Sequence, residues 1–468
     1  MSSPFQPIDW ILFLFYFLLL LGLTLWRRKQ QEDDETFMIG GRRLSLFAFV
    51  ATLVSTWYGG ILGVGEFSFQ YGISQWIVMG LPYYLFAGLF ATFLAGRIRE
   101  HPAISLPEAI GQTYGESTGR WSTLLIFILV NPAPYLLMLA TLFHYMTGGE
   151  GPFLLYATAT AFFSIVYVMV GGFNAVVRTD ILQTLFMFAG FLVLLISAIS
   201  EIGSPADLWR QLPELHRDPT GGQSLSYLAV WFFIALWTFV DPGFHQRAAA
   251  AKTPETARKG IALSILCWFL FDMLTLTTAL YGWLLLGPDL ADPVLVYPIM
   301  ASELLPAGWL GLFFLTLLAV IMSTLDSYLF LSGQTIGRDL FPGENRTWNQ
   351  RTRTRAGMVV AALIALLLVT IYPSVIDLWY VIGSVTIPGL LIPILGVYIP
   401  LFRCQREAAR KILFGATSLS LTWLLVGTWT ASGPAYSFLG IEPFYPGLLL
   451  SIGIWWNDRT RGRRIRPI

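Results

Sequence analysis

One long apolar segment of the sequence contains a cluster of oxygen-bearing side chains, in the run AVIMSTLDS at residues 319–327. If this segment is a helix, Ser323, Asp326 and Ser327 share one face, because residues three and four positions apart are neighbours on a helix surface. Thr324 then lies one position round the helix. Hard cations such as sodium prefer oxygen ligands. The cluster therefore favours a sodium site that combines two hydroxyl groups with backbone carbonyls from a neighbouring segment.

Buried carboxylates strengthen this interpretation. Hydroxyl groups in apolar helices often donate to their own backbone, which alone would account for an isolated Ser-Thr pair. An Asp in the middle of a membrane span costs ~2.5 to 3.5 kcal/mol, so Asp326 needs a cation, a proton, a polar partner or water. Asp180, Asp272 and Glu66 lie in other apolar runs and raise the same question, although Asp180 follows Arg178 closely and is also consistent with an interfacial position.

Two apolar segments contain residues that interrupt helices. One has the glycine pair 59–60 after a run of small hydroxyl residues, and the other has the sequence Asp-Pro-Gly at 241–243. Proline removes a backbone donor and glycine loosens the chain. Transporters use such breaks, because unwound carbonyls and helix ends hold ions and solutes. Close helix packing would also explain the glycines, and a helix end near the cytoplasmic surface would explain Asp-Pro-Gly.

The composition indicates what surrounds these segments. The 468 residues are 55% hydrophobic and only 12% charged, against about 25% charged in a typical soluble domain. The apolar residues fall into runs of about 17 to 25, the length of helix that crosses a bilayer. Since backbone polar groups in lipid must be paired within the segment, the fold class is an all-α polytopic membrane protein.

The two cysteines are far apart and suggest neither a disulfide framework nor a metal cluster.

Thirteen membrane-spanning helices are expected from the apolar runs and the Gly, Pro and charged residues between them. Their predicted ranges are 9–26, 44–70, 73–96, 121–147, 152–171, 179–200, 226–246, 260–286, 304–335, 356–372, 375–402, 412–430 and 443–457. The last run is short and contains Pro443 and Pro446. Whether it spans the bilayer decides on which side the C-terminus lies.

The distribution of basic residues predicts the orientation. With thirteen spans, 27 of the 29 Lys and Arg residues fall in segments on one side, and only Arg210 and Arg217 lie on the other. Basic residues collect in cytoplasmic loops. We therefore expect a plasma (inner) membrane protein with its N-terminus outside and its C-terminus in the cytoplasm. The basic C-terminal tail is then a topology anchor that touches lipid, and no nucleic-acid partner is expected.

The positions of the two breaks predict an internal repeat within a single transmembrane domain, residues 1–468. With the first span (9–26) set aside, each broken span begins a unit of five, at 44–200 and 226–402, and two C-terminal spans (412–457) follow. Because five is odd, the two units are inserted in opposite directions. Such inverted repeats place a binding site near the middle of the bilayer.

Several short motifs occur in order along the chain: GGRRL at 40–44, LPEA at 106–109, GGFNAV at 171–176 with RTDILQ at 178–183, DP at 241–242 with QR at 246–247, and MSTLDS at 322–327. With these motifs the chain resembles the sodium:solute symporter family, which includes bacterial proline, pantothenate, sialic acid and galactose symporters and mammalian sodium-glucose cotransporters. The resemblance extends from about residue 9 to 400. It implies a LeuT-like core of five plus five helices with one helix before it.

The resemblance also implies ion sites. Carried over by motif, the principal sodium ligands are the carbonyls of Leu53, Thr56 and Val320 and the hydroxyls of Ser323 and Thr324. Other members often have Ala at the position of Val320, which a backbone ligand tolerates. Some members hold a second cation at positions that match Asp180, Ser323, Asp326 and Ser327, but members with serine in place of Asp326 make this second set less secure.

Solute contacts are poorly encoded. The candidates in and near the broken spans are Ser55, Trp57, Glu66, Gln70, Asn131, Tyr135, Trp237 and Asp241. Each such residue is more often a packing or interfacial residue than a contact. We expect no Lys or Arg at mid-membrane, which disfavours an acidic sugar but leaves open amino acids held by a helix dipole.

The expected function is sodium-coupled symport of a small organic solute (an amino acid, sugar or monocarboxylate) into the cytoplasm by alternating access. Na⁺ is the only metal expected, no cofactor is implied, and the chain is expected to act as a monomer. Two alternatives stay open: proton coupling through Asp180 or Asp326, and a sensor that keeps the transporter fold. An enzyme is not expected, because no nucleophile-base pair, metal cluster or phosphate loop stands out.

Overall fold

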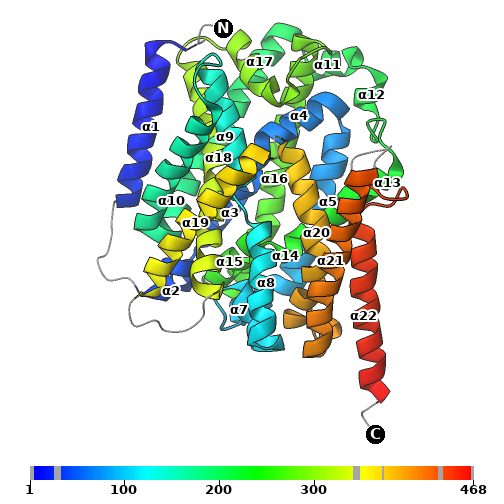
Figure 1. Cartoon of the computed structure of the whole chain (residues 1–468). Helices are drawn as coiled ribbons and strands as arrows, with labels where there is room; N and C mark the ends of the chain where they lie inside the picture. The colour runs from blue at the N-terminus through cyan, green and yellow to red at the C-terminus, as the bar shows by residue number, and fades with distance from the viewer. Residues whose placement is uncertain (1–4, 26–32, 341–347, 372–373, 431–435, 465–468) are drawn as a thin grey trace.

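Nearly every long apolar run forms a helix in the computed structural model, which describes residues 5–25, 33–340, 348–371, 374–430 and 436–464. Eleven helices or groups of consecutive helices within these ranges are long and apolar enough to cross a membrane. They pack side by side in one bundle (Figure 1). The chain is therefore an all-helical, multi-pass membrane protein.

The helices are α1 (Pro7–Leu25), α2 (Asp34–Ile39), α3 (Leu46–Trp57), α4 (Ile61–Tyr71), α5 (Leu81–Phe90), α6 (Gly96–Glu100), α7 (Leu106–Tyr114), α8 (Glu116–Leu129), α9 (Ala133–Met146), α10 (Phe153–Ile202), α11 (Pro205–Gln211), α12 (Glu214–Arg217), α13 (Leu225–Ile234), α14 (Trp237–Val240), α15 (Pro242–Ala250), α16 (Pro254–Leu286), α17 (Val296–Leu304), α18 (Trp309–Gln334), α19 (Gln350–Ile371), α20 (Val375–Tyr398), α21 (Arg406–Thr430) and α22 (Phe444–Arg464). Short 3₁₀ or π turns are η1 (Gly40–Arg42), η2 (Tyr58–Gly60), η3 (Trp76–Gly80), η4 (Ala91–Ala95), η5 (Pro293–Leu295), η6 (Thr335–Leu340) and η7 (Pro400–Phe402).

The predicted number of spans differs from this count at two places. The predicted spans 152–171 and 179–200 lie in one 50-residue helix, α10, which is interrupted where Gly172 has φ 59° and ψ −154°. Helix α22 is not among the eleven candidate spans. Thirteen spans and the five-plus-five repeat therefore remain predictions.

The first predicted break is confirmed. Helix α3 ends at Trp57, the turn η2 follows, and α4 continues to Tyr71. Both glycines of the turn are also packed closely: a Cβ atom on Gly59 would lie 2.1 Å from Thr324 Oγ1, and one on Gly60 would lie 2.1 Å from the Trp379 ring. The glycines thus serve the break and the close packing together.

The second predicted break is confirmed as well. Asp241 has an extended backbone (φ −69°, ψ 115°) between α14 and α15, and its Oδ1 accepts from the backbone N–H groups of Gly243 (2.6 Å) and Phe244 (3.2 Å). Asp241 is only 2% exposed, and α15 continues beyond it to Ala250, so the sequence Asp-Pro-Gly interrupts the segment rather than ends it. An additional break separates α13 from α14 at residues 235–236.

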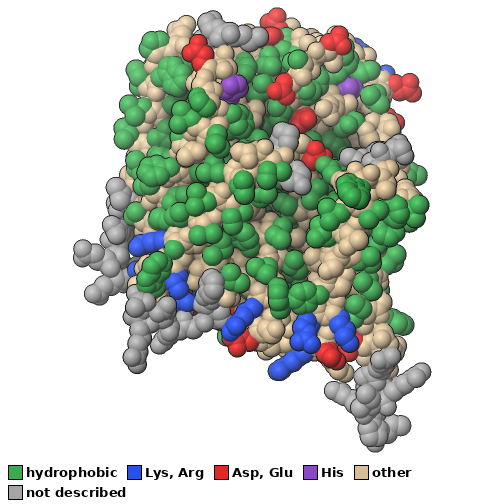
Figure 2. Space-filling model, viewed as in Figure 1, with side chains coloured by type: hydrophobic (Ala, Val, Ile, Leu, Met, Phe, Trp, Pro, Cys, Tyr) green, Lys and Arg blue, Asp and Glu red, His purple; other side chains and the backbone are tan. Residues whose placement is uncertain are grey.

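The two ends of the molecule differ in charge on the visible face, although some Asp and Glu also lie among the basic residues. Lys and Arg gather at the end opposite the N-terminus of α1, and Asp and Glu gather at the end that carries it (Figure 2). This agrees with the charge distribution in the sequence. The predicted orientation also used five basic residues that lie outside the described residues: Arg27, Arg28, Lys29, Arg346 and Arg466.

Replacing Gly59 with Ala is expected to destabilise the protein. The added methyl group would overlap the Thr324 side chain, and overpacking of this kind typically costs about 1 to 3 kcal/mol. Thermal unfolding of the purified protein in detergent measures the effect. Gly88→Ala on α5 is the matched control, because a Cβ atom there meets nothing within 4 Å. Equal unfolding temperatures for the two variants would contradict the close contact.

Candidate sodium and solute sites

Helix α18 presents two hydroxyl groups to the broken segment of α3. Thr324 Oγ1 donates to the carbonyl of Thr56 (2.6 Å), and Ser323 Oγ lies 2.9 Å from Ser55 Oγ. The other two predicted sodium ligands, Leu53 and Val320, are buried on the same two helices. The hydroxyls of Ser323 and Thr324 thus meet the end of α3, where the Thr56 carbonyl is in direct contact with one of them.

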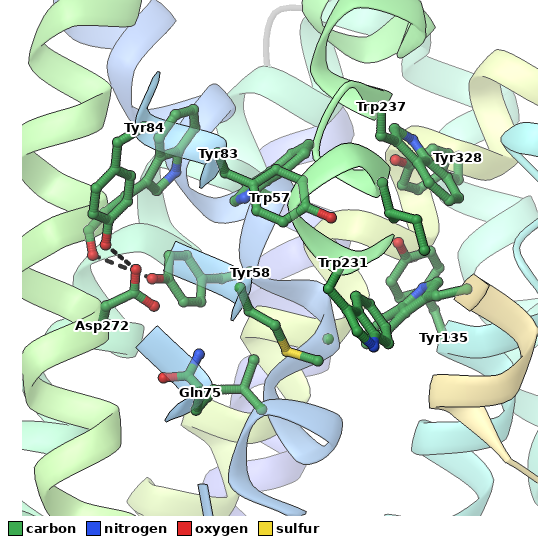
Figure 3. A pocket seen from close by; sticks show the side chains of 16 residues that line it. Trp57, Tyr58, Gln75, Tyr83, Tyr84, Tyr135, Trp231, Trp237, Asp272 and Tyr328 are labelled. Atoms are coloured by element: carbon green, nitrogen blue, oxygen red, sulfur yellow. Dashed lines mark hydrogen bonds between the residues drawn. The ribbon is translucent and has the colours of Figure 1, made fainter. Parts of the chain in front are cut away.

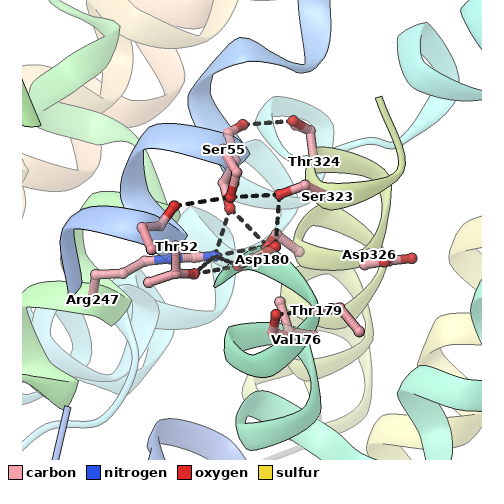
Figure 4. Close-up of polar contacts among 12 residues, drawn as sticks. Thr52, Ser55, Val176, Thr179, Asp180, Arg247, Ser323, Thr324 and Asp326 are labelled. Carbon is pink, nitrogen blue, oxygen red and sulfur yellow. Dashed lines mark hydrogen bonds and ion pairs between the residues drawn. The ribbon is translucent and has the colours of Figure 1, made fainter. Parts of the chain in front are cut away.

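Asp180 joins this group from α10. It accepts from Ser323 Oγ at Oδ1 (2.6 Å) and from the Thr52 hydroxyl at Oδ2 (Figure 4). Its side chain is completely buried. Asp180 therefore faces the protein interior, where its carboxylate contacts hydroxyl groups of α3 and α18.

Arg247 on α15 is the main departure from the sequence-based expectation. Its side chain is fully buried beside the predicted sodium site, 3.8 Å from Asp180 Oδ2, and donates to the hydroxyls of Ser327 (2.7 Å) and Thr56 (2.9 Å). Arg247 is not among the site residues predicted from the sequence. The apolar run of alanines at 248–251 that follows Arg247 was a signal that this segment returns to the protein interior.

Asp326 lies apart from the other residues of the predicted second cation set. The Tyr167 hydroxyl of α10 donates to Asp326 Oδ2, and Oδ1 has no hydrogen-bond partner among the described residues. Figure 4 shows Asp326 away from the contacts around Asp180. The structure thus brings Asp180 and Ser327 together through Arg247, but it does not bring Asp326 to them.

A cavity of about 110 Å³ lies next to the α3–α18 junction, and ten of its sixteen lining residues are Trp or Tyr (Figure 3). Among the predicted solute contacts, Trp57, Tyr135 and Trp237 line it. The other predicted contacts do not line it. Ser55 donates to the Ala51 carbonyl, and Asn131 Oδ1 accepts from Ala133 N at the start of α9. Glu66 and Gln70 are half-buried on α4, and Asp241 lies behind the lining.

Asp241 fixes two of the aromatic rings. Its Oδ2 accepts from the Tyr328 hydroxyl (2.7 Å) and from Trp237 Nε1 (3.2 Å), while Oδ1 caps α15. Tyr328 in turn stacks on Tyr135, with ring centroids 5.2 Å apart. The second helix break therefore orients one wall of the cavity.

Most of the polar and aromatic lining residues are not among the solute contacts predicted from the sequence, and they include Gln75, Tyr328 and Asp272. Asp272 was noticed as a buried carboxylate but not as a solute contact. Tyr328 follows Ser327 directly, so the hydroxyl cluster of α18 was a signal that could have found it. Gln75 lies in the short segment before η3, where no motif points to a role.

The pattern of the sodium:solute symporter family matches residues 37–398. The chain belongs to the sodium:solute symporter family. Sodium-coupled symport of a solute is therefore its general activity, and its relatives are transporters rather than enzymes.

Characterised relatives align over most of the chain. The osmoregulated proline transporter OpuE of Bacillus subtilis is 24% identical, and the alignment covers 93% of this chain and 91% of that protein. The sodium/proline symporter of Escherichia coli is 26% identical over 76% of this chain and 74% of its own length. The sodium/glucose cotransporter of Vibrio parahaemolyticus is 24% identical over the same shares of the two chains.

Solved structures share the fold. A Na⁺-coupled sialic acid symporter in a substrate-bound outward-open state superposes with a TM-score of 0.80 at 15% identity, over 99% of both chains. The nucleobase-cation-symport-1 family transporter Mhp1, in a closed conformation, gives a TM-score of 0.64 at 15% identity, over 93% of this chain and 97% of its own. The bundle is therefore a LeuT-like transporter fold.

A double-mutant cycle on Asp180 and Arg247 tests the buried ion pair. Asp180→Asn or Arg247→Gln alone leaves one buried charge without its partner, which typically costs about 3 to 5 kcal/mol. The double variant is expected to lose less than the sum of the two, by about 0.5 to 3 kcal/mol. Denaturation in detergent measures the coupling.

The exposed pair Lys259–Glu255 on α16 (2.7 Å) is the matched control, with an expected coupling of at most about 1 kcal/mol. Additive effects for Asp180 and Arg247 would contradict the pairing.

Proposed function

We propose that this protein carries a small organic solute from outside into the cytoplasm together with sodium, which binds between α3 and α18. The ligands are the carbonyls of Leu53, Thr56 and Val320 and the hydroxyls of Ser323 and Thr324. The observation that carries the proposal is the contact of 2.6 Å between the Thr324 hydroxyl and the Thr56 carbonyl. A cation between these oxygens would replace a direct hydrogen bond with ligand bonds to both helices.

The two helices of the ion site also form part of the cavity wall. Thr56 directly precedes Trp57, and Thr324 lies four residues before Tyr328, and both aromatic residues line the cavity. Sodium that joins α3 to α18 thus favours one arrangement of the cavity. A ligand shifts a conformational equilibrium by its difference in affinity for the two states, so sodium binding and solute binding are coupled.

In the proposed cycle, external sodium binds first and favours the outward-open cavity. Solute binding then triggers closure, and inward opening releases sodium past Asp180.

One sodium crossing a 100 mV potential releases ~2.3 kcal/mol, and a tenfold gradient adds about 1.4 kcal/mol. One sodium per cycle therefore concentrates a neutral solute several-hundred-fold. The protein acts as a monomer in the inner membrane, with its N-terminus outside.

Arg247 bears on the number of sodium ions. Its guanidinium lies among oxygens that a second sodium would need, since it donates to Ser327 and pairs with Asp180. Asp326 points to Tyr167 instead. The arrangement therefore supports one sodium per solute.

Uptake into proteoliposomes tests the proposed function. A panel of radiolabelled amino acids, sugars, monocarboxylates and choline is offered with and without an inward sodium gradient. We expect sodium-dependent accumulation of at least one solute, which Ser323→Ala/Thr324→Ala abolishes. The matched control is Ser264→Ala/Thr278→Ala, because these buried hydroxyls donate only to their own helix, α16. Uptake driven by a proton gradient instead, or sodium-enhanced binding without uptake, would contradict sodium symport.

The sodium stoichiometry gives a separate prediction. Initial uptake rates of the transported solute, plotted against sodium concentration, should follow a hyperbola with a Hill coefficient near one. The guanidinium of Arg247 lies beside Asp180, among the oxygens that a second sodium would need, so we expect only one sodium to bind. A sigmoidal curve with a coefficient near two would show a second sodium and contradict this assignment.

A further inference from the structure

The cavity beside the ion site has an unusual balance of charge. Among the described residues that line it, Asp272 on α16 is the one carboxylic acid, and none is Lys, Arg or His. Asp272 is 4% exposed and accepts from the Tyr84 hydroxyl at Oδ2 (Figure 3). A solute with a cationic group would find a counter-charge there, whereas a solute carboxylate would find no side chain of opposite charge.

The cavity also offers few free hydrogen-bonding groups. Three of its five tyrosine hydroxyls already donate to protein acceptors: Tyr58 to the Trp268 carbonyl (3.2 Å), Tyr84 to Asp272 and Tyr328 to Asp241 (2.7 Å). The Gln75 amide lines the cavity with neither its oxygen nor its nitrogen bonded. The ring N–H groups of Trp231 and Trp268 are also unbonded, so the free groups are one amide and two single donors. Sugar hydroxyls need more partners than these, whereas a solute with one or two polar atoms does not.

Aromatic rings supply the remaining surface, and their positions are fixed. Trp57 lies 5.1 Å from Tyr83 and 5.8 Å from Trp268 between ring centroids, and Tyr135 stacks on Tyr328. Ring faces attract cations, and methylated ammonium groups are the cations that aromatic cages recognise, because they have few or no N–H donors to satisfy. Rings held in place in advance lose little conformational entropy on binding.

We propose that the cavity binds a small solute with a trimethylammonium group, whose charge is balanced by Asp272 and whose methyl groups lie against the aromatic rings. This inference rests on the proposed symport and names its substrate class. Gln75 is free to bond the polar end of the solute. The concentration of Asp and Glu at one end of the molecule (Figure 2) favours the approach of a cation from that side.

Equilibrium binding to the purified full chain tests the proposal, with [¹⁴C]choline and [¹⁴C]glycine betaine as probes in sodium or potassium chloride. We expect choline to bind more tightly than betaine, because no lining cation pairs with the betaine carboxylate, and to bind more tightly in sodium. The neutral carbon isostere of choline, 3,3-dimethylbutan-1-ol, should compete at least about tenfold more weakly than unlabelled choline. Equal competition by the isostere would overturn the role of the charge.

Variants test the two recognition elements. Asp272→Asn should weaken choline binding about tenfold or more, while Asp289→Asn in an exposed loop should leave it unchanged. Trp57→Leu should weaken binding, and Trp57→Phe, which keeps a ring, should restore most of it. The competition measurement with the isostere uses the unmodified chain. It therefore tests whether the charge of choline contributes to binding even if Asp272→Asn fails to fold. Choline affinity that is unchanged in Asp272→Asn would overturn the proposal.

Failure of this inference is distinguishable from failure of the proposed symport. If neither probe binds while another solute shows sodium-dependent uptake that requires Ser323 and Thr324, the substrate class is wrong and symport stands. If choline binds identically in sodium and in potassium, and no solute of the panel shows sodium-dependent uptake, sodium symport itself is wrong.

Discussion

The contact between the Thr324 hydroxyl and the Thr56 carbonyl is the interaction on which the rest of the arrangement depends. A helix that stops inside a membrane protein leaves carbonyl groups without their usual partners, and such groups must be satisfied by another element, water or an ion. Here α3 ends at Trp57, and α18 supplies a hydroxyl at the carbonyl just before that end. Gly59 allows this approach because any larger residue would meet Thr324.

Each buried carboxylate near the two sites is stabilised in a different way. Asp241 accepts from two backbone N–H groups and orients two aromatic rings. Asp180 pairs with Arg247 and accepts from hydroxyls. Asp272 has a tyrosine hydroxyl on one side and the cavity on the other. Burying a charge is costly unless it is paired, and the proposed cationic solute would supply the partner that Asp272 lacks among the residues that line the cavity.

Sequence reasoning located the helices and both breaks because hydrophobic run length, proline and glycine act locally. It grouped Ser323 and Thr324 with the α3 break through family motifs, and the structure places these residues in contact. It did not find the burial of Arg247, the separate position of Asp326 or the role of Asp272. Those depend on which helices pack together and on how α10 bends at Gly172, and no single segment of the sequence encodes such contacts.

Direct binding of ²²Na⁺ to the purified protein tests the central claim, which is that sodium occupies the junction of α3 and α18. The account predicts saturable binding that Ser323→Ala/Thr324→Ala removes and that Asp272→Asn, in the neighbouring cavity, leaves in place. Undiminished ²²Na⁺ binding in a folded Ser323→Ala/Thr324→Ala variant would contradict the account.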